Sequence, residues 1–177
     1  VSRAEVRMPA DPAAALADVD EALKLNPLSA AALQLKAHLL SERLNRPDDA
    51  LRVLDQVVAA YPDAAVFRAG RGVMLARRGR YQAARLDARD ALLRENKAAI
   101  LYQVGCIYAL TSPDRRDDRG EAVRLVWLAL KAGYGLEYVD TDPDLNSIRE
   151  DAEFVRVVRA AKALHEKTAG PAEDAGR

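Results

Sequence analysis

Apolar side chains recur along the chain every three or four residues, in segments separated by short polar turns. Residues 50–62 show the pattern in A-L-R-V-L-D-Q-V-V-A-A-Y-P, where Tyr61-Pro62 ends the helix. With comparable patterns elsewhere, the predicted helices are residues 11–25, 30–43, 47–60, 63–78, 81–94 and 151–167. Asp11 is expected to cap the first of these helices and Asp63 the fourth, and Gly79 to turn the chain between two helices. The pattern therefore predicts an all-α protein.

The helices recur in pairs with a period close to 34 residues. Ala15, Ala50 and Ala84 lie 35 and 34 residues apart, and Gly72 and Cys106 are again 34 apart. This period is typical of two-helix units that stack into a solenoid. The next interval grows to 38 residues, and the excess falls in T-S-P-D-R-R-D-D-R-G, residues 111–120. We interpret this charged stretch as a loop insertion, since an insertion at a surface turn costs little.

The repeated positions carry small side chains where paired helices are expected to cross. Ala50 and Ala84 lie on second helices of their units, and Gly72 and Cys106 at the matching place on first helices. Small side chains let helix axes approach to about 8–10 Å. We therefore assign these residues to packing.

A charged pair is predicted at the same crossing. Arg71 and Asp87 should face each other within one unit and form a partly buried ion pair. The role predicted for this pair is structural specificity, not catalysis.

The period divides the chain into four parts: an extension at 1–10, an array at 11–134, a linker and capping helix at 135–167, and a disordered tail at 168–177. Within the array we expect an orphan helix at 11–26 and repeats at 30–62, 63–96 and 98–133. Residues 1–10 leave no room for a partner of the orphan helix, and the chain starts with Val1. We therefore expect a piece of a longer protein.

The array resembles the tetratricopeptide repeat family. The resemblance is carried by R-G-V-M-L-A-R-R-G-R-Y-Q-A-A-R-L-D-A-R-D-A-L-L, residues 71–93, together with residues 50–62. The sequence departs from the family pattern at Gln34, Arg68, His38 and Asn96. The resemblance implies a right-handed α-solenoid of helix hairpins with a C-terminal capping helix, whose first helices line a concave binding face. It also implies a non-catalytic scaffold for protein–protein interaction.

The segment after the array is similar to the closing segment of bacterial tetratricopeptide arrays. The similarity lies in Tyr-Gly, then Asp-Pro-Asp-Leu, then Ile-Arg-Glu-Asp-x-x-Phe, over residues 134–154. Some of those arrays follow a serine/threonine protein kinase domain, which implies a regulatory or scaffolding appendage. Phe154, Val155, Val157 and Val158 are expected to form an apolar stripe that covers the last repeat.

On this solenoid the concave groove is predicted to have an apolar floor with arginines at one edge. Such a groove would suit a peptide with apolar anchors and an acidic group, although the arginines could equally be solvated. The expected lining is Leu35, Leu39, Arg43, Ala69, Val73, Arg77, Gln103 and Ile107.

Composition and charge narrow the class of partner. Lys plus Arg and Asp plus Glu each number 27, so the formal net charge is zero, which argues against nucleic acid or an acidic membrane as the partner. No apolar run approaches the roughly 20 residues of a membrane span. The single cysteine, Cys106, excludes an internal disulfide. We expect a cytoplasmic protein.

Candidate chemistry is sparse. Asp140, Asp142, Asp144 and Asn146 alternate in the manner of a calcium loop, but Leu145 stands where that loop needs glycine. Helix capping, by Asp142 before Pro143 and by Glu150 or Asp151 before the last helix, is the favoured interpretation. The histidines lack partners at metal-ligand spacing, and no nucleophile or nucleotide-binding motif is present. We predict no enzyme activity, cofactor or metal.

Three functions follow, in order of preference. The first is a protein-binding module of a larger bacterial signalling or scaffold protein. The second is an intramolecular regulatory or homo-oligomerisation element, of a serine/threonine kinase for example, whose groove is filled by its parent or by a second copy. The third is an accessory domain of an enzyme that binds a small ligand, which an apolar groove disfavours.

Overall fold

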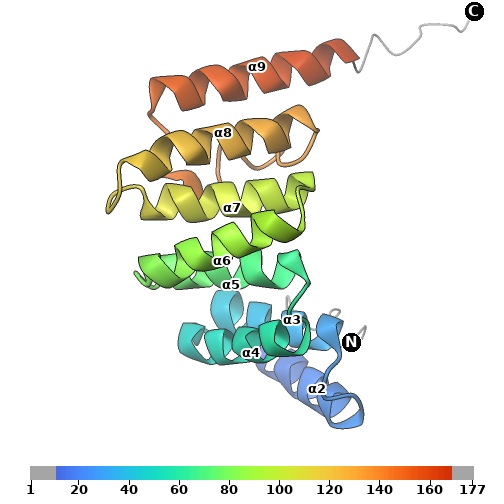
Figure 1. Ribbon diagram of the computed structural model, residues 1–177. Coiled ribbons are helices and arrows are strands. Elements are labelled where there is room, and N and C mark those ends of the chain that lie inside the picture. The colour runs from blue at the N-terminus through green and yellow to red at the C-terminus, as the bar shows by residue number, and fades with distance from the viewer. Residues whose placement is uncertain (1–10, 169–177) are drawn as a thin grey trace, which may run out of the picture.

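The computed structural model describes residues 11–168, and every regular element in that range is helical (Figure 1). The α-helices are α2 (Pro12–Leu25), α3 (Ala30–His38), α4 (Pro47–Ala60), α5 (Ala65–Arg77), α6 (Tyr81–Arg94), α7 (Ala98–Thr111), α8 (Asp117–Lys131) and α9 (Ala152–Thr168). Two short elements complete the set, the π-helical turn η1 (Leu39–Arg43) and the 3₁₀ turn η2 (Pro143–Leu145). The helices stack in one direction from α2 to α9. This is an all-α solenoid of tetratricopeptide-type hairpins.

The helices pack as hairpins in chain order. α3 and η1 pack on α4, α5 packs on α6 and α7 packs on α8, while α5 also contacts α7 across the boundary between units. α2 packs on α3 and η1 at one end, and α9 packs on α8 at the other. The predicted extension 1–10 and residues 169–177 of the predicted tail lie outside the described residues. Thr168, expected in the tail, ends α9.

Local signals fix some of the helix ends. The Asp11 carboxylate accepts a hydrogen bond from the Ala14 N–H at 2.9 Å, and Pro12 follows it in the first turn of α2, as predicted. Gly79 has a φ of 72°, the left-handed conformation that ends α5 and that side chains disfavour. The cap predicted for Asp63 is wrong, because the N-cap of α5 is Ala64 and the helix has no side-chain cap.

The first helix of the first complete unit contains a π-helical turn. The Leu39 N–H still bonds to the Leu35 carbonyl, whereas the Leu44 N–H donates to the Leu39 carbonyl at 3.0 Å, a spacing of five residues, so the face presented by the helix shifts after Leu39. The two leucines at this point are both buried, on different faces of the helix. Leu39 packs against Ala15 and Val19 in the cluster under α2, whereas Leu40 joins the main core.

The charged stretch at residues 111–120 is only partly a loop. Thr111 ends α7 and α8 begins at Asp117, so the connection comprises residues 112–116. Asp118 lies in the first turn of α8 and is 5% exposed. Its carboxylate accepts hydrogen bonds at 2.6 Å from both Arg85 Nε and Thr111 Oγ1. These buried contacts draw residues 117–120 into the helix and correct the predicted loop.

Residues 133–151, which we call the strap, run from α8 to α9 along α7. Val139, Leu145 and Ile148 are at most 1% exposed and join the main core. α9 then covers α8 through Phe154 and Val158, while Val155 is 43% exposed and falls outside the apolar stripe predicted for it. The Asp142 carboxylate accepts from the Asp144 N–H, and Asp151 accepts from the N–H groups of Glu153 and Phe154. The capping predicted for these two residues is confirmed.

The ion pair predicted between Arg71 and Asp87 is present. Arg71 Nε and Nη2 each lie 2.7 Å from a carboxylate oxygen of Asp87, whose side chain is 5% exposed. Arg71 Nη1 also lies 2.9 Å from Asp55 on α4, whose side chain is 60% exposed. Arg71 therefore joins α5 to the second helices of two successive units.

Substitution of Asp87 by alanine should lower the free energy of unfolding by about 2–4 kcal/mol, because it leaves the partly buried Arg71 without its bidentate partner. Asp55→Ala removes the exposed contact of the same guanidinium and should cost less than about 1 kcal/mol. Urea denaturation monitored by circular dichroism measures both changes. Equal effects of the two substitutions would contradict the structural role of the buried pair.

The two glycines of α5 should respond in opposite ways to alanine. A Cβ added at Gly72 would lie 2.5 Å from Ile107 Cδ1 and 3.2 Å from Asp87 Cβ, whereas one added at Gly70 meets nothing within 4 Å. Gly72→Ala should therefore destabilise the fold by about 1–3 kcal/mol through overpacking. Gly70→Ala should stabilise it by about 0.5–1 kcal/mol through helix propensity. Melting temperatures that shift in the same direction would contradict this assignment of the crossing.

Candidate functional site

A cavity of about 440 Å³ lies on the face formed by the first helices of the three units. We call it the groove. α3 and η1 contribute Gln34, His38, Ser41 and Glu42; α5 contributes Gly70, Val73 and Arg77; α7 contributes Tyr102, Gln103 and Cys106; and the strap contributes Tyr134, Tyr138, Asp142 and Asp144. The strap therefore supplies one wall of a groove that the helices alone would leave open.

Three members of the predicted lining reach the groove, namely Val73, Arg77 and Gln103. Leu39, Ala69 and Ile107 are fully buried, which corrects the predicted stripe. Leu39 packs under α2 on the same helix face as Ala32 and Leu35, and Ile107 fills the space between α5 and α7 beside Gly72. Leu35 is partly buried against the cluster under α2, and Arg43 is exposed outside the groove lining.

Arg77 is engaged by the chain's own carboxylates. Its Nε and Nη2 lie 2.7 and 3.0 Å from the two oxygens of Asp144, and its Nη1 lies 2.7 Å from Glu42. Burial raises the pKa of Asp144, and the hydrogen bonds from Arg77 oppose that rise. Because the guanidinium faces two carboxylates already, it does not serve the acidic ligand group for which the sequence suggested it.

Sequence reasoning missed the strap as part of the site. Tyr134 and Tyr138 contact Tyr102 and each other edge to face, with ring centroids 5.2 to 6.0 Å apart. Gly135, with a φ of 90°, makes this contact possible, because an added Cβ would lie 2.5 Å from the Tyr102 ring. The sequence Gly-Tyr-Gly at residues 133–135 was the signal for this contact, since alternating glycines beside an aromatic residue indicate close approach of the backbone.

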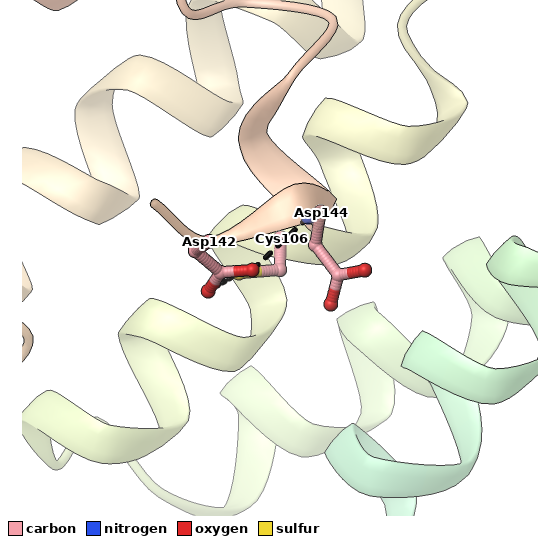
Figure 2. Close-up of side chains that lie close together, drawn as sticks. All are labelled: Cys106, Asp142 and Asp144. Atoms are coloured by element: carbon pink, nitrogen blue, oxygen red, sulfur yellow. Dashed lines mark hydrogen bonds between the residues drawn. The ribbon is translucent and has the colours of Figure 1, made fainter. Parts of the chain in front are cut away.

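Cys106, Asp142 and Asp144 converge where the strap crosses α7 (Figure 2). One ligand-type atom from each lies within 4.8 Å of the others, a spacing that a metal ion could use. The donor set does not fit a metal ion, because Arg77 already binds both oxygens of Asp144. Burial also raises the pKa of the Cys106 thiol well above its usual range, so the thiol is protonated and donates to Asp142 at 3.8 Å. The cluster therefore fastens the strap to α7.

The calcium-loop alternation disperses in the structure. Asp140 pairs with Lys162 of α9, and the Asn146 side chain accepts from Arg149 at 2.9 Å. Asp142 and Asp151 are the caps described above. His38 lines the groove, and His165 lies 3.0 Å from the Leu130 carbonyl. These side chains therefore serve separate local contacts.

A larger hollow of about 880 Å³ lies beside the first turn of α6. Arg80, Arg85, Arg89 and Arg115 border it, and Arg85 is bound to Asp114 and Asp118 at 2.6 Å. Residues of one hairpin and of the connection between α7 and α8 line this hollow, whereas three units and the strap form the groove. We therefore take the groove as the candidate site.

Similarities between this chain and known proteins agree with the fold. Residues 39–100, about a third of the chain, match the tetratricopeptide repeat family. No curated protein matches the chain. Within the described range no helix is long and apolar enough to cross a membrane.

Solved structures of MamA share the architecture. A crystal structure of MamA is 20% identical with a TM-score of 0.58, over 93% of this chain and 95% of that one. The MamA RS-1 ArsTM double mutant is 17% identical with a TM-score of 0.60, over 94% of each chain. At this level of identity the likeness establishes the fold alone.

Cys106 should resist alkylation in the native protein. It is 3% exposed and its pKa is raised by burial, so iodoacetamide should react with it far more slowly than with the urea-unfolded chain. Mass spectrometry of the labelled protein measures the two rates. Rapid native labelling that increases steeply near the ordinary thiol pKa of about 8.5 would contradict the protonated, buried thiol.

Proposed function

We propose that this chain is a non-catalytic protein-binding module that holds a peptide or protein segment of a partner in the groove. The observation that carries the proposal is the construction of the groove from the first helices of all three units. Stacked helix repeats use the surface that their units form together, and not a pocket within one unit, to hold extended partners.

The lining suits a peptide. Val73 and the open position at Gly70 provide apolar floor, while Gln34 and Gln103 offer amide groups that can hydrogen-bond to a peptide backbone. The volume of about 440 Å³ accommodates a few side chains, at the lower end of the usual ligand-pocket range. A short segment with one or two anchoring side chains is the ligand that fits.

Catalysis gains no support from the groups in the groove. The Cys106 thiol is held protonated by burial, and the Asp144 carboxylate is bound by Arg77. Burial, ahead of the neighbouring charges, raises the pKa of Tyr102, so its hydroxyl serves as a donor to Asp142. The polar groups at this point hold the strap and leave no activated nucleophile or base.

The proposed parent is a larger bacterial signalling or scaffold protein, on the resemblance of residues 134–154 to the closing segments of bacterial arrays. A cytoplasmic location belongs to the same proposal, because the buried thiol of Cys106 fits a reducing compartment. The strap already places the chain's own residues in the groove, which favours a second candidate. In that candidate the rest of the groove is filled by another segment of the parent or by a second copy.

Filling the groove should abolish binding without unfolding the protein. A random peptide library displayed on phage is selected on the wild-type chain, and recovered peptides are titrated against Gly70→Tyr by fluorescence anisotropy. The new side chain enters open space at the groove floor, so affinity should fall by at least about tenfold.

Gly120→Tyr is the matched control. Gly120 is also a helical glycine, on α8, with nothing within 4 Å of an added Cβ, and it lies outside the groove lining. Equal binding by both variants, or failure to recover any peptide, would overturn the proposal. Concentration-dependent dimerisation that Gly70→Tyr abolishes would instead establish the second candidate.

A further inference from the structure

The strap end of the groove carries an excess of negative charge. Glu42, Asp142 and Asp144 line the groove with Arg77 as their counter-charge, so the lining has three carboxylates against one guanidinium. Arg77 divides its donors between Asp144 and Glu42. Three carboxylates against one guanidinium leave an excess of two negative charges, and Asp142 is the carboxylate that accepts no hydrogen bond from Arg77.

Asp142 is held in place by neutral donors. Its oxygens accept hydrogen bonds from the Tyr102 hydroxyl at 3.1 Å, the Cys106 thiol at 3.8 Å and the Asp144 N–H at 3.0 Å. Among the ion pairs found within residues 11–168, those at the groove engage Arg77 with Glu42 and with Asp144. Arg149, the nearby cation of the strap, donates to the Asp142 backbone carbonyl and not to its carboxylate. The carboxylate is thus oriented but not neutralised.

Aromatic rings and an unsatisfied acceptor adjoin this charge. Tyr134 and Tyr138 pack edge to face around Tyr102, and Tyr134 is 37% exposed. The face of a tyrosine ring attracts a cation. On α7, the Gln103 side-chain oxygen is buried without a donor, an arrangement that buried polar groups normally avoid. The charge and the ring faces together favour a cation.

We infer that the strap end of the groove binds a positively charged group of the partner peptide, between the Asp142 carboxylate and the tyrosines. The group is the ammonium of a lysine or the guanidinium of an arginine side chain, or the amino terminus of the peptide, which offers the same chemistry. This inference rests on the proposed function, because it names the chemistry of the peptide that the groove holds. The ligand group inferred here is basic, whereas the sequence suggested an acidic one.

The test uses the peptides recovered from the phage library. They should be enriched in lysine or arginine relative to the unselected library, and binding should weaken as salt is added. Asp142→Asn removes the charge but keeps one oxygen to accept from the Asp144 N–H, and its amide can donate to the Tyr102 oxygen in place of the second carboxylate contact; it should weaken binding by about tenfold or more. Asp140→Asn, two positions away on the strap and outside the groove lining, is the matched control and should bind as wild type.

A change on the peptide keeps the test decisive if Asp142→Asn fails to fold. Replacing the selected lysine by glutamine or the arginine by citrulline should cause the same loss on wild-type protein. Acetylation of the peptide amino terminus separates the two sources of the cation, since it weakens binding only if the terminus is the bound group. Recovered peptides whose binding is unchanged both by replacement of their basic side chains and by acetylation of the amino terminus would overturn the inference and leave the peptide-binding function intact.

Discussion

The ion pair between Arg77 and Asp144 joins the last turn of α5 to the strap, across 67 residues of sequence. Arg77 Nε and Nη2 both donate to Asp144, which fixes the strap beside α7. There Tyr102 and Cys106 donate hydrogen bonds to the neighbouring Asp142. The groove owes its fourth wall to this arrangement. Its negative charge also follows from it, since Arg77 is shared between Asp144 and Glu42 while the Asp142 carboxylate is held by neutral donors.

Much of the stack could be predicted because its determinants repeat along the sequence. Ala50 and Ala84 recur at the helix crossings and are fully buried, and a side chain at Gly72 would collide with Ile107. The same register placed Arg71 opposite Asp87. These features depend on the hairpin geometry that every unit shares, so a period read from the sequence is sufficient to locate them.

The groove could be predicted only in part, because its lining depends on features that do not repeat. α2 lies on α3 and buries Leu39 with Ala15 and Val19, and the pattern within a repeat does not say how a helix outside the paired units packs on it. The strap is held by contacts between residues distant in sequence, and these contacts convert Arg77 from a ligand-binding group into a structural one. A prediction based on helix faces alone therefore did not include Tyr134 and Tyr138.

The central claim is that a peptide occupies the groove between the first helices and the strap. The most direct measurement is nuclear magnetic resonance of the ¹⁵N-labelled chain during titration with a peptide recovered from the library. A peptide in the groove should give the largest amide shifts at Gln34, Gly70, Gln103 and Tyr134, which line the groove on α3, α5, α7 and the strap. Shifts concentrated instead at the first turn of α6, beside the arginine-bordered hollow, would contradict it.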